Sequence, residues 1–258
     1  MNKIDWHKYA DYIFCLHYLE NNRLNEISKT LTNININIFD TSFFSFSYDI
    51  EHCIFKEQYQ NMKETSFYFF NKHAQFDGSD LKNTVHNYIF YLGYNTYKTL
   101  KITQYFNYDR IIIFEDDIIF LKDTDYIIKA MDFIKEQDFD ICMCQTTFVD
   151  AWHGIKSYLV NYGCKDFGND MFLRTNKPNG LFGGGFIILT NSGINKIVKY
   201  FEDNNLMVCI DALDTLRNVL NLNTLFALKP LCIQNDMINW TEARRNDENI
   251  NIKLEDYI

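Results

Sequence analysis

Residues 110–120 read Arg110-Ile-Ile-Ile-Phe-Glu-Asp-Asp-Ile-Ile-Phe120, so that three carboxylates are enclosed by apolar residues. A short β-branched apolar run is typical of a buried central strand. Three adjacent carboxylates are costly to bury unless a cation meets them. They follow the strand, at the carboxyl end where open α/β sheets bind their ligands. Because hard oxygen ligands suit Mg²⁺ or Mn²⁺, the stretch predicts a metal site that holds a phosphate-bearing substrate.

The composition indicates a well-packed globular protein. The chain has 258 residues, of which 47% are hydrophobic, enough for one large domain or two small ones. A net charge of −9 argues against broad binding to nucleic acid, whose phosphates attract a basic surface. Seven cysteines, an odd number without zinc-ligand spacing, predict reduced buried thiols.

The sequence favours a cytoplasmic location. No charged and then apolar leader opens the chain, and no apolar run reaches the roughly 18 residues that a membrane-spanning helix needs. Peripheral association with the inner face of the cell membrane is compatible with this expectation.

Strand patterns alternate with helix patterns along the chain. Strands or short apolar runs are expected at 9–16, 34–39, 110–114, 140–144, 182–189 and 224–233. Helices are expected at 23–31, 83–106 with a break near Gly93, 124–137, 192–201 and 211–220. Residues 145–181 have the composition of a long irregular stretch. The pattern predicts a single α/β domain over residues 1–240, with a mainly parallel central sheet flanked by helices, followed by a polar tail over 241–258.

The acidic run has a geometry that can be predicted if the strand continues through it. Glu115 and Asp117 would then share one face, roughly 6.6 Å apart along the strand, and Asp116 would point elsewhere. One metal ion between Glu115 and Asp117 would fit this spacing.

Four segments carry a resemblance to one known family and occur in matching order. They are Tyr12-Ile-Phe-Cys-Leu16 with the following Arg23, Ile111-Ile-Ile-Phe-Glu-Asp-Asp-Ile118, Phe182-Gly-Gly-Gly-Phe-Ile-Ile-Leu189 with Ser192-Gly193, and Lys229-Pro-Leu-Cys-Ile-Gln234. Together they resemble glycosyltransferases of the family 25 type of lipopolysaccharide biosynthesis, which have the Rossmann-like GT-A fold. The resemblance spans roughly residues 10–236.

This resemblance implies a metal-dependent, inverting transfer of a sugar from a nucleotide-sugar, most plausibly a UDP-sugar, to a hydroxyl of a lipooligosaccharide or capsular glycan. Glu115 and Asp117, joined by Asp236, would hold Mn²⁺ or Mg²⁺ on the diphosphate. Asp211 and Asp214 are the candidates for the base that takes the acceptor proton. The expected donor contacts are Leu16, Tyr18, Arg23, Asp116, Gly183, Gly184 and Gly185.

Each of these groups also has a purely structural interpretation. The acids could be a solvated strand end, Arg23 a surface charge at a helix start, and the three glycines a tight turn into a strand. Asp211 and Asp214 could be ordinary residues of a helix N-terminus.

Two other functions remain open on the sequence. A metal-dependent phosphohydrolase or nuclease would also use clustered acids, although Glu115 is a poor phosphoryl acceptor. A catalytically silent sugar-nucleotide-binding protein is the third interpretation. It is kept because the helix before the acids has Gly93-Tyr-Asn-Thr-Tyr97 where the resembled family has a Ser-His pair.

Overall fold

The computed structural model describes residues 3–17, 23–48, 84–145, 160, 164–169, 171–175, 185–207 and 213–234, with the backbone alone at 48, 84–92, 175, 213–215, 218 and 234. The strands are β1 Tyr12–His17, β2 Phe44–Tyr48, β3 Arg110–Glu115, β4 Ile118–Phe120, β5 Ile141–Met143, β6 Lys165–Asp166, β7 Phe172–Thr175, β8 Phe186–Thr190, β9 Thr224–Ala227 and β10 Cys232–Gln234. The helices are the short 3₁₀ turn η1 Trp6–Lys8, then α1 Leu24–Asn33, α3 Thr84–Phe106, α4 Thr124–Lys135, α6 Asn191–Asn204 and α7 Leu213–Leu220.

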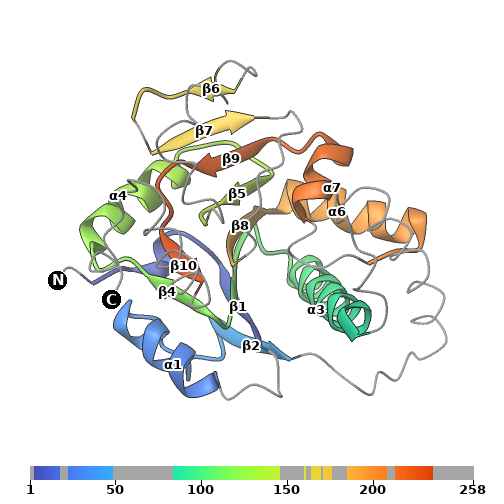
Figure 1. Ribbon diagram of the computed structural model, residues 1–258, viewed down its shortest axis with the longest axis horizontal. Coiled ribbons are helices and arrows are strands. Elements are labelled where there is room, and N and C mark those ends of the chain that lie inside the picture. Colours follow the sequence, from blue (N-terminus) through green and yellow to red (C-terminus); the bar gives the residue numbers. More distant parts are fainter. Residues whose placement is uncertain are drawn as a thin grey trace, which may run out of the picture.

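The protein is α/β, as expected, and is built on a sheet in the order β2-β1-β3-β8-β5-β9-β7-β6 (Figure 1). Strand β1 is parallel to β2 and β3, and β5 is parallel to β9. Strand β8, however, runs antiparallel to both of its neighbours, β3 and β5. The sheet is therefore mixed: the expected parallel pairing holds among β2, β1 and β3 and between β5 and β9, and it is wrong at β8 and at β7. The chain enters β8 beside the carboxyl end of β3, where the Glu115 N–H donates to the Gly185 carbonyl, so β8 must run back.

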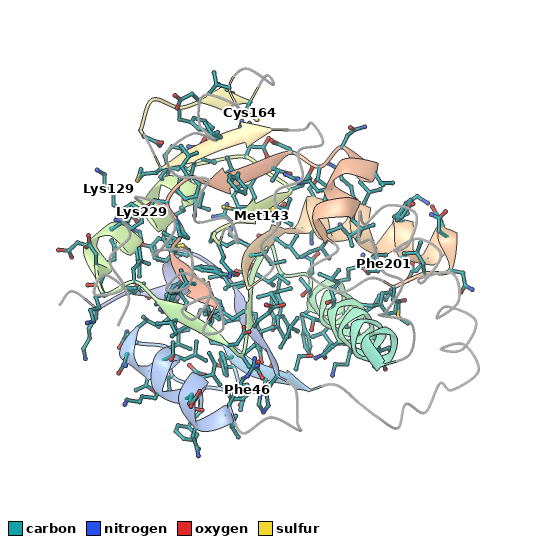
Figure 2. The ribbon with its side chains drawn as sticks, viewed as in Figure 1. Phe46, Lys129, Met143, Cys164, Phe201 and Lys229 are labelled. Carbon is teal, nitrogen blue, oxygen red and sulfur yellow. The ribbon has the colours of Figure 1, made fainter. Side chains whose placement is uncertain are left out.

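Helices cover both faces of the sheet. On one face, α1 and α4 pack with the small antiparallel sheet of β4 and β10; on the other, α3, α6 and α7 pack together (Figure 1). Strand β3 contributes to both cores, with Ile112 and Phe114 on the first face and Ile111 and Ile113 on the second. Met143 and Phe201, labelled in Figure 2, belong to the second core. Burial on both faces explains why β3 is a continuous apolar run and does not alternate.

The strand predicted at 34–39 is absent from this described part of the chain, and β2 lies further along. Ile34 and Ile36 are buried, which produces the alternation. Between them Asn35 has φ 67°, a left-handed conformation that ends α1 and turns the chain. The Ile36 N–H then donates to the Leu31 carbonyl, as at a helix terminus. The alternation was therefore the signature of a helix end packed on the core.

The run at 224–233 forms two strands in different sheets. Strand β9 belongs to the large sheet, whereas β10 pairs with β4. Pro230 lies between them and has no N–H to give to a ladder. The supposedly irregular stretch 145–181 contains β6 and β7, which extend the sheet at its edge.

The expected break near Gly93 is wrong, because helix α3 runs through Gly93 without interruption. Other expectations about local structure are confirmed. Helix α4 begins as predicted, because the Asp123 carboxylate accepts the Tyr126 N–H. The cysteines within the described residues, at 15, 142, 144, 164 and 232, are all buried free thiols. No helix in the described part of the chain has the length and apolarity needed to cross a membrane.

Candidate functional site at the carboxyl end of β3

The acidic run forms a turn between two strands. Strand β3 ends at Glu115, Asp116 and Asp117 make the turn, and β4 begins at Ile118. The expectation that strand alternation continues to Asp117 is therefore wrong, because the strand ends at Glu115 and the chain turns at Asp116 and Asp117. Asp116 is 8% exposed, while Glu115 and Asp117 are partly exposed. The turn gathers the three carboxyl groups at the carboxyl end of a central strand.

This turn lies at a point where the strand order reverses. From β1 the chain passes through α1 to β2 on one side, and α3 later leads to β3 on the other side. Leu16 near the end of β1 is in register with Glu115 at the end of β3. Connections that leave on opposite sides open a crevice outside the carboxyl ends of two such strands, where open α/β sheets bind ligands. The acidic turn borders that crevice.

Two basic side chains meet the acids. The Nδ1 atom of His17 lies 2.6 Å from Asp116 Oδ2, and His17 is 4% exposed. The guanidinium of Arg23 lies 3.4 Å from Asp116 Oδ1 and 3.2 Å from Asp117 Oδ2. His17 ends β1 and Arg23 immediately precedes α1, so the first β–α connection supplies both groups. Arg23 supplies a cation and His17 a hydrogen-bond partner, which a cluster of partly buried carboxylates needs.

The negative charge of Glu115, Asp116 and Asp117 affects two neighbouring thiols. Burial raises the pKa of the Cys15 thiol well above its usual value, and the carboxylates of the turn raise it further. Burial likewise raises the pKa of the Cys232 thiol, and the charges of Asp117 and Glu115 raise it further. Cys15 lies in β1 and Cys232 in β10, so the acids act on strands of both sheets. Such a concentration of negative charge attracts a divalent cation.

The carboxylate oxygens of Glu115, Asp116 and Asp117 are chemically suited to Mg²⁺ or Mn²⁺, which prefer hard oxygen ligands. Among the described residues, no set of three His, Cys, Asp or Glu side chains is arranged as a complete metal-binding group. The predicted third ligand, Asp236, lies outside the described residues. Glu115 and Asp117 are thus the described residues that could supply the first ligands of a metal ion.

The structure places the other predicted residues as follows. Leu16 is 2% exposed and packs in the core, so it borders the site through its backbone. Arg23 contacts the acids, as given above, and Gly185 pairs with Glu115 through the backbone. Asp214 lies in α7, but its side chain is outside the described residues. Four further predicted residues also lie outside them: Tyr18, Gly183, Gly184 and Asp211.

Two residues near the turn escaped the sequence-based prediction. His17 is the last residue of β1, and this position brings its imidazole to Asp116. Gln145 follows the apolar run of β5 and is completely buried. For both, the signal was a polar residue at the end of a buried apolar run, which is where α/β sheets bind ligands.

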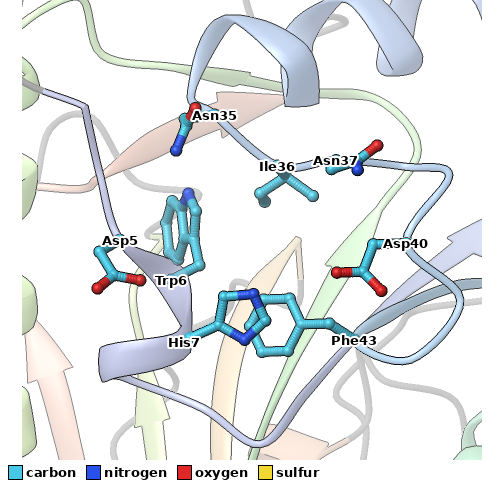
Figure 3. Close-up of a pocket in the computed structure, with 8 residues that line it drawn as sticks. All are labelled: Asp5, Trp6, His7, Asn35, Ile36, Asn37, Asp40 and Phe43. Atoms are coloured by element: carbon cyan, nitrogen blue, oxygen red, sulfur yellow. The ribbon is translucent and has the colours of Figure 1, made fainter.

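A pocket of about 290 Å³ lies elsewhere on the molecule (Figure 3). Its lining includes Trp6 and His7 of η1, Asp40, and Phe43, on whose ring His7 stacks. Residues 6–8 precede β1 and Phe43 precedes β2, so the pocket borders the amino ends of these strands. It is therefore at the opposite edge of the sheet from the acidic turn.

Comparison with known proteins adds no assignment. The chain matches no protein-family model, and a search of curated proteins finds no significant match.

Proposed function

We propose that this protein is a metal-dependent glycosyltransferase that uses a nucleotide-sugar donor, with a GT-A-like arrangement of its domain. The observation that carries the proposal is the gathering of Glu115, Asp116 and Asp117 in one turn at the reversal of strand order. A nucleoside diphosphate is a ligand that such a crevice accommodates. A divalent cation held by the acids would neutralise its phosphates.

Different residues of the acidic turn and its neighbours would bind different parts of the donor. Glu115 and Asp117 would hold Mn²⁺ or Mg²⁺, which supplies charge stabilisation to the departing diphosphate. Asp116, held by His17 and Arg23, would contact the ribose. Because Arg23 is 35% exposed while it touches Asp116 and Asp117, it can also reach a phosphate oxygen at the same place.

In the reaction, the bond between the sugar's anomeric carbon and the diphosphate oxygen breaks, and the electron pair leaves with the nucleoside diphosphate. A bond forms between the anomeric carbon and the acceptor hydroxyl oxygen. The hydroxyl proton passes to a base, for which Asp211 and Asp214 remain the candidates. We propose a hydroxyl of a bacterial surface glycan as the acceptor and an inverting outcome, on the resemblance of the four sequence segments.

The test is a thermal-shift screen with nucleoside diphosphates and nucleotide-sugars, each with and without Mn²⁺. A ligand that binds the folded state raises the melting temperature by mass action. We expect a shift that needs Mn²⁺ and that is lost in the double variant Glu115→Gln, Asp117→Asn. Asp138→Asn is the matched control, because Asp138 is an exposed carboxylate that precedes β5 at its amino end.

Activity assays then separate the three candidate functions. Turnover of a generic phosphate ester without a sugar acceptor would favour a phosphohydrolase. Nucleotide-sugar binding without transfer to any member of a broad acceptor array would favour a silent binding protein. No shift with any nucleotide from a folded protein would overturn the proposal.

A further inference from the structure

Gln145 is a buried amide that makes no hydrogen bond within the described part of the chain. Its side chain is 0% exposed, and among the residues that the structure describes neither its oxygen nor its nitrogen has a hydrogen-bond partner. Leaving such a group unsatisfied costs stability, and native proteins contain few of them. An apolar side chain of the same size would avoid this cost, so the amide needs an explanation other than packing.

The position of Gln145 links it to the acidic turn. The pairing of β8 with β3 and β5 places Phe186 opposite Phe114 and Ile187 opposite Met143. When the first register is continued by one residue and the second by two, Gly185 lies between Glu115 and Gln145. The hydrogen bond from the Glu115 N–H to the Gly185 carbonyl, 3.0 Å, continues the first pairing. Adjacent strands are about 4.8 Å apart, so the three residues form a short row at the sheet's edge.

The missing side chain of Gly185 makes room for the amide. A Cβ atom at residue 185 would lie 2.1 Å from Gln145 Oε1 and 3.0 Å from Ile118 Cγ2. The amide of Gln145 therefore lies over Gly185, beside the first residue after the acidic turn. Any side chain at residue 185 would displace it.

We infer that Gln145 is a specificity residue that hydrogen-bonds a hydroxyl of the sugar carried by the donor. A carboxamide has one accepting oxygen and a donating nitrogen, and a sugar hydroxyl both donates and accepts. The inference rests on the proposed function, since it places the transferred sugar next to the diphosphate that the acidic turn would hold. It names the part of the donor that Gln145 recognises, which is the sugar and not the nucleotide.

The experiment compares wild type with Gln145→Met, which keeps the length of the side chain and removes both polar atoms. The probes are the nucleoside diphosphate that gives the largest shift with Mn²⁺ and its glucose, galactose and N-acetylglucosamine conjugates, measured by calorimetric titration. We expect the variant's affinity for the diphosphate alone to stay within about twofold. Its affinity for the preferred sugar conjugate should fall about tenfold or more, the effect of one lost hydrogen bond to a buried group.

The melting temperature provides a second readout. Because the amide has no partner in the described structure, Gln145→Met should leave the melting temperature of the unliganded protein unchanged or raise it. Gln104→Met is the matched control, because the amide of Gln104 donates to Asn195 on the surface. Loss of this hydrogen bond should change the affinity for neither the diphosphate nor the sugar conjugate. Gln145→Leu replaces the methionine variant if that protein does not fold.

The results distinguish the two proposals. If wild type binds no nucleoside diphosphate, the proposed function fails. Suppose that wild type binds the diphosphate. If Gln145→Met then lowers the affinity for both probes equally, or for neither probe, only the inference about Gln145 fails. A fall in melting temperature without selective loss of the sugar conjugate would assign Gln145 a structural role, such as holding a buried water, and would also overturn the inference.

Discussion

The imidazole Nδ1 of His17 lies 2.6 Å from the Asp116 carboxylate, although 99 positions of sequence separate the two residues. Both side chains are almost fully buried, so the contact occurs away from bulk water, where hydrogen bonds to a carboxylate are strong. The contact joins the end of β1 to the turn after β3. It fixes the orientation of Asp116 relative to its two acidic neighbours.

Replacement of His17 should weaken nucleotide binding although His17 is not expected to touch the ligand. His17→Phe removes the hydrogen bond to Asp116 while keeping an aromatic ring beside Phe46. Loss of a partner that orients a site carboxylate typically costs 10–100-fold in affinity, and we expect about tenfold for the diphosphate with Mn²⁺. Calorimetric titration measures it, with His7→Phe, at the opposite edge of the sheet, as control. Equal affinities of His17→Phe and wild type would contradict this role.

Replacement of Arg23 should act in opposite directions on metal and nucleotide. Arg23→Gln removes the cation that lies on Asp116 and Asp117, so Mn²⁺ alone should bind several times more tightly. The nucleoside diphosphate should bind less tightly, because a phosphate loses its guanidinium partner. Titrations with Mn²⁺ and then with nucleotide separate the effects. Lys29→Gln, an exposed charge on α1, is the control, and a parallel change in both affinities would refute the prediction.

Asp140 should make the fold sensitive to acid. Burial by itself raises the pKa of Asp140, but hydrogen bonds from Lys196, the Asn223 N–H and Ser192 outweigh it and hold the pKa below its ordinary value. A carboxyl group whose pKa is lower in the folded state stabilises the protein above the pKa of the unfolded chain, about 3.9, and this stability is lost as pH falls through the folded pKa. The free energy of unfolding, measured in urea from about pH 6 down to about pH 2, should therefore fall less steeply in Asp140→Asn than in wild type. Parallel curves would contradict the prediction.

Gly193 should not tolerate a side chain. A Cβ atom at residue 193 would lie 2.2 Å from the Asp140 carbonyl oxygen, which is backbone and cannot rotate away. Gly193→Ala should therefore lower the free energy of unfolding by about 1–3 kcal/mol, the usual cost of overpacking, even though alanine is the better helix former. Urea denaturation measures this. Lys199→Ala, an exposed change on the same helix, should cost far less, and an equal loss in both variants would exclude the steric explanation.

Several features of the fold could be predicted from local pattern because local physics decides them. The β-branched run before Glu115 is a strand buried on both faces, and the helix expected from residue 124 begins there. The same reasoning failed at Asn35, where a left-handed helix end imitated strand alternation. It also failed at β8, because strand direction depends on which sheet edge the chain reaches and not on the residues of the strand.

The candidate site divides in the same way. The sequence by itself determined that Glu115, Asp116 and Asp117 lie at the end of a buried strand, because the apolar run before them is local in the chain. Tertiary structure alone decided that His17 and Arg23 reach the acids, and that Gln145 lies over Gly185 beside them. These contacts join strands that are neighbours in the sheet and distant in the chain. Local periodicity carries no information about which strands become neighbours, because sheet order is settled by the packing of both cores at once.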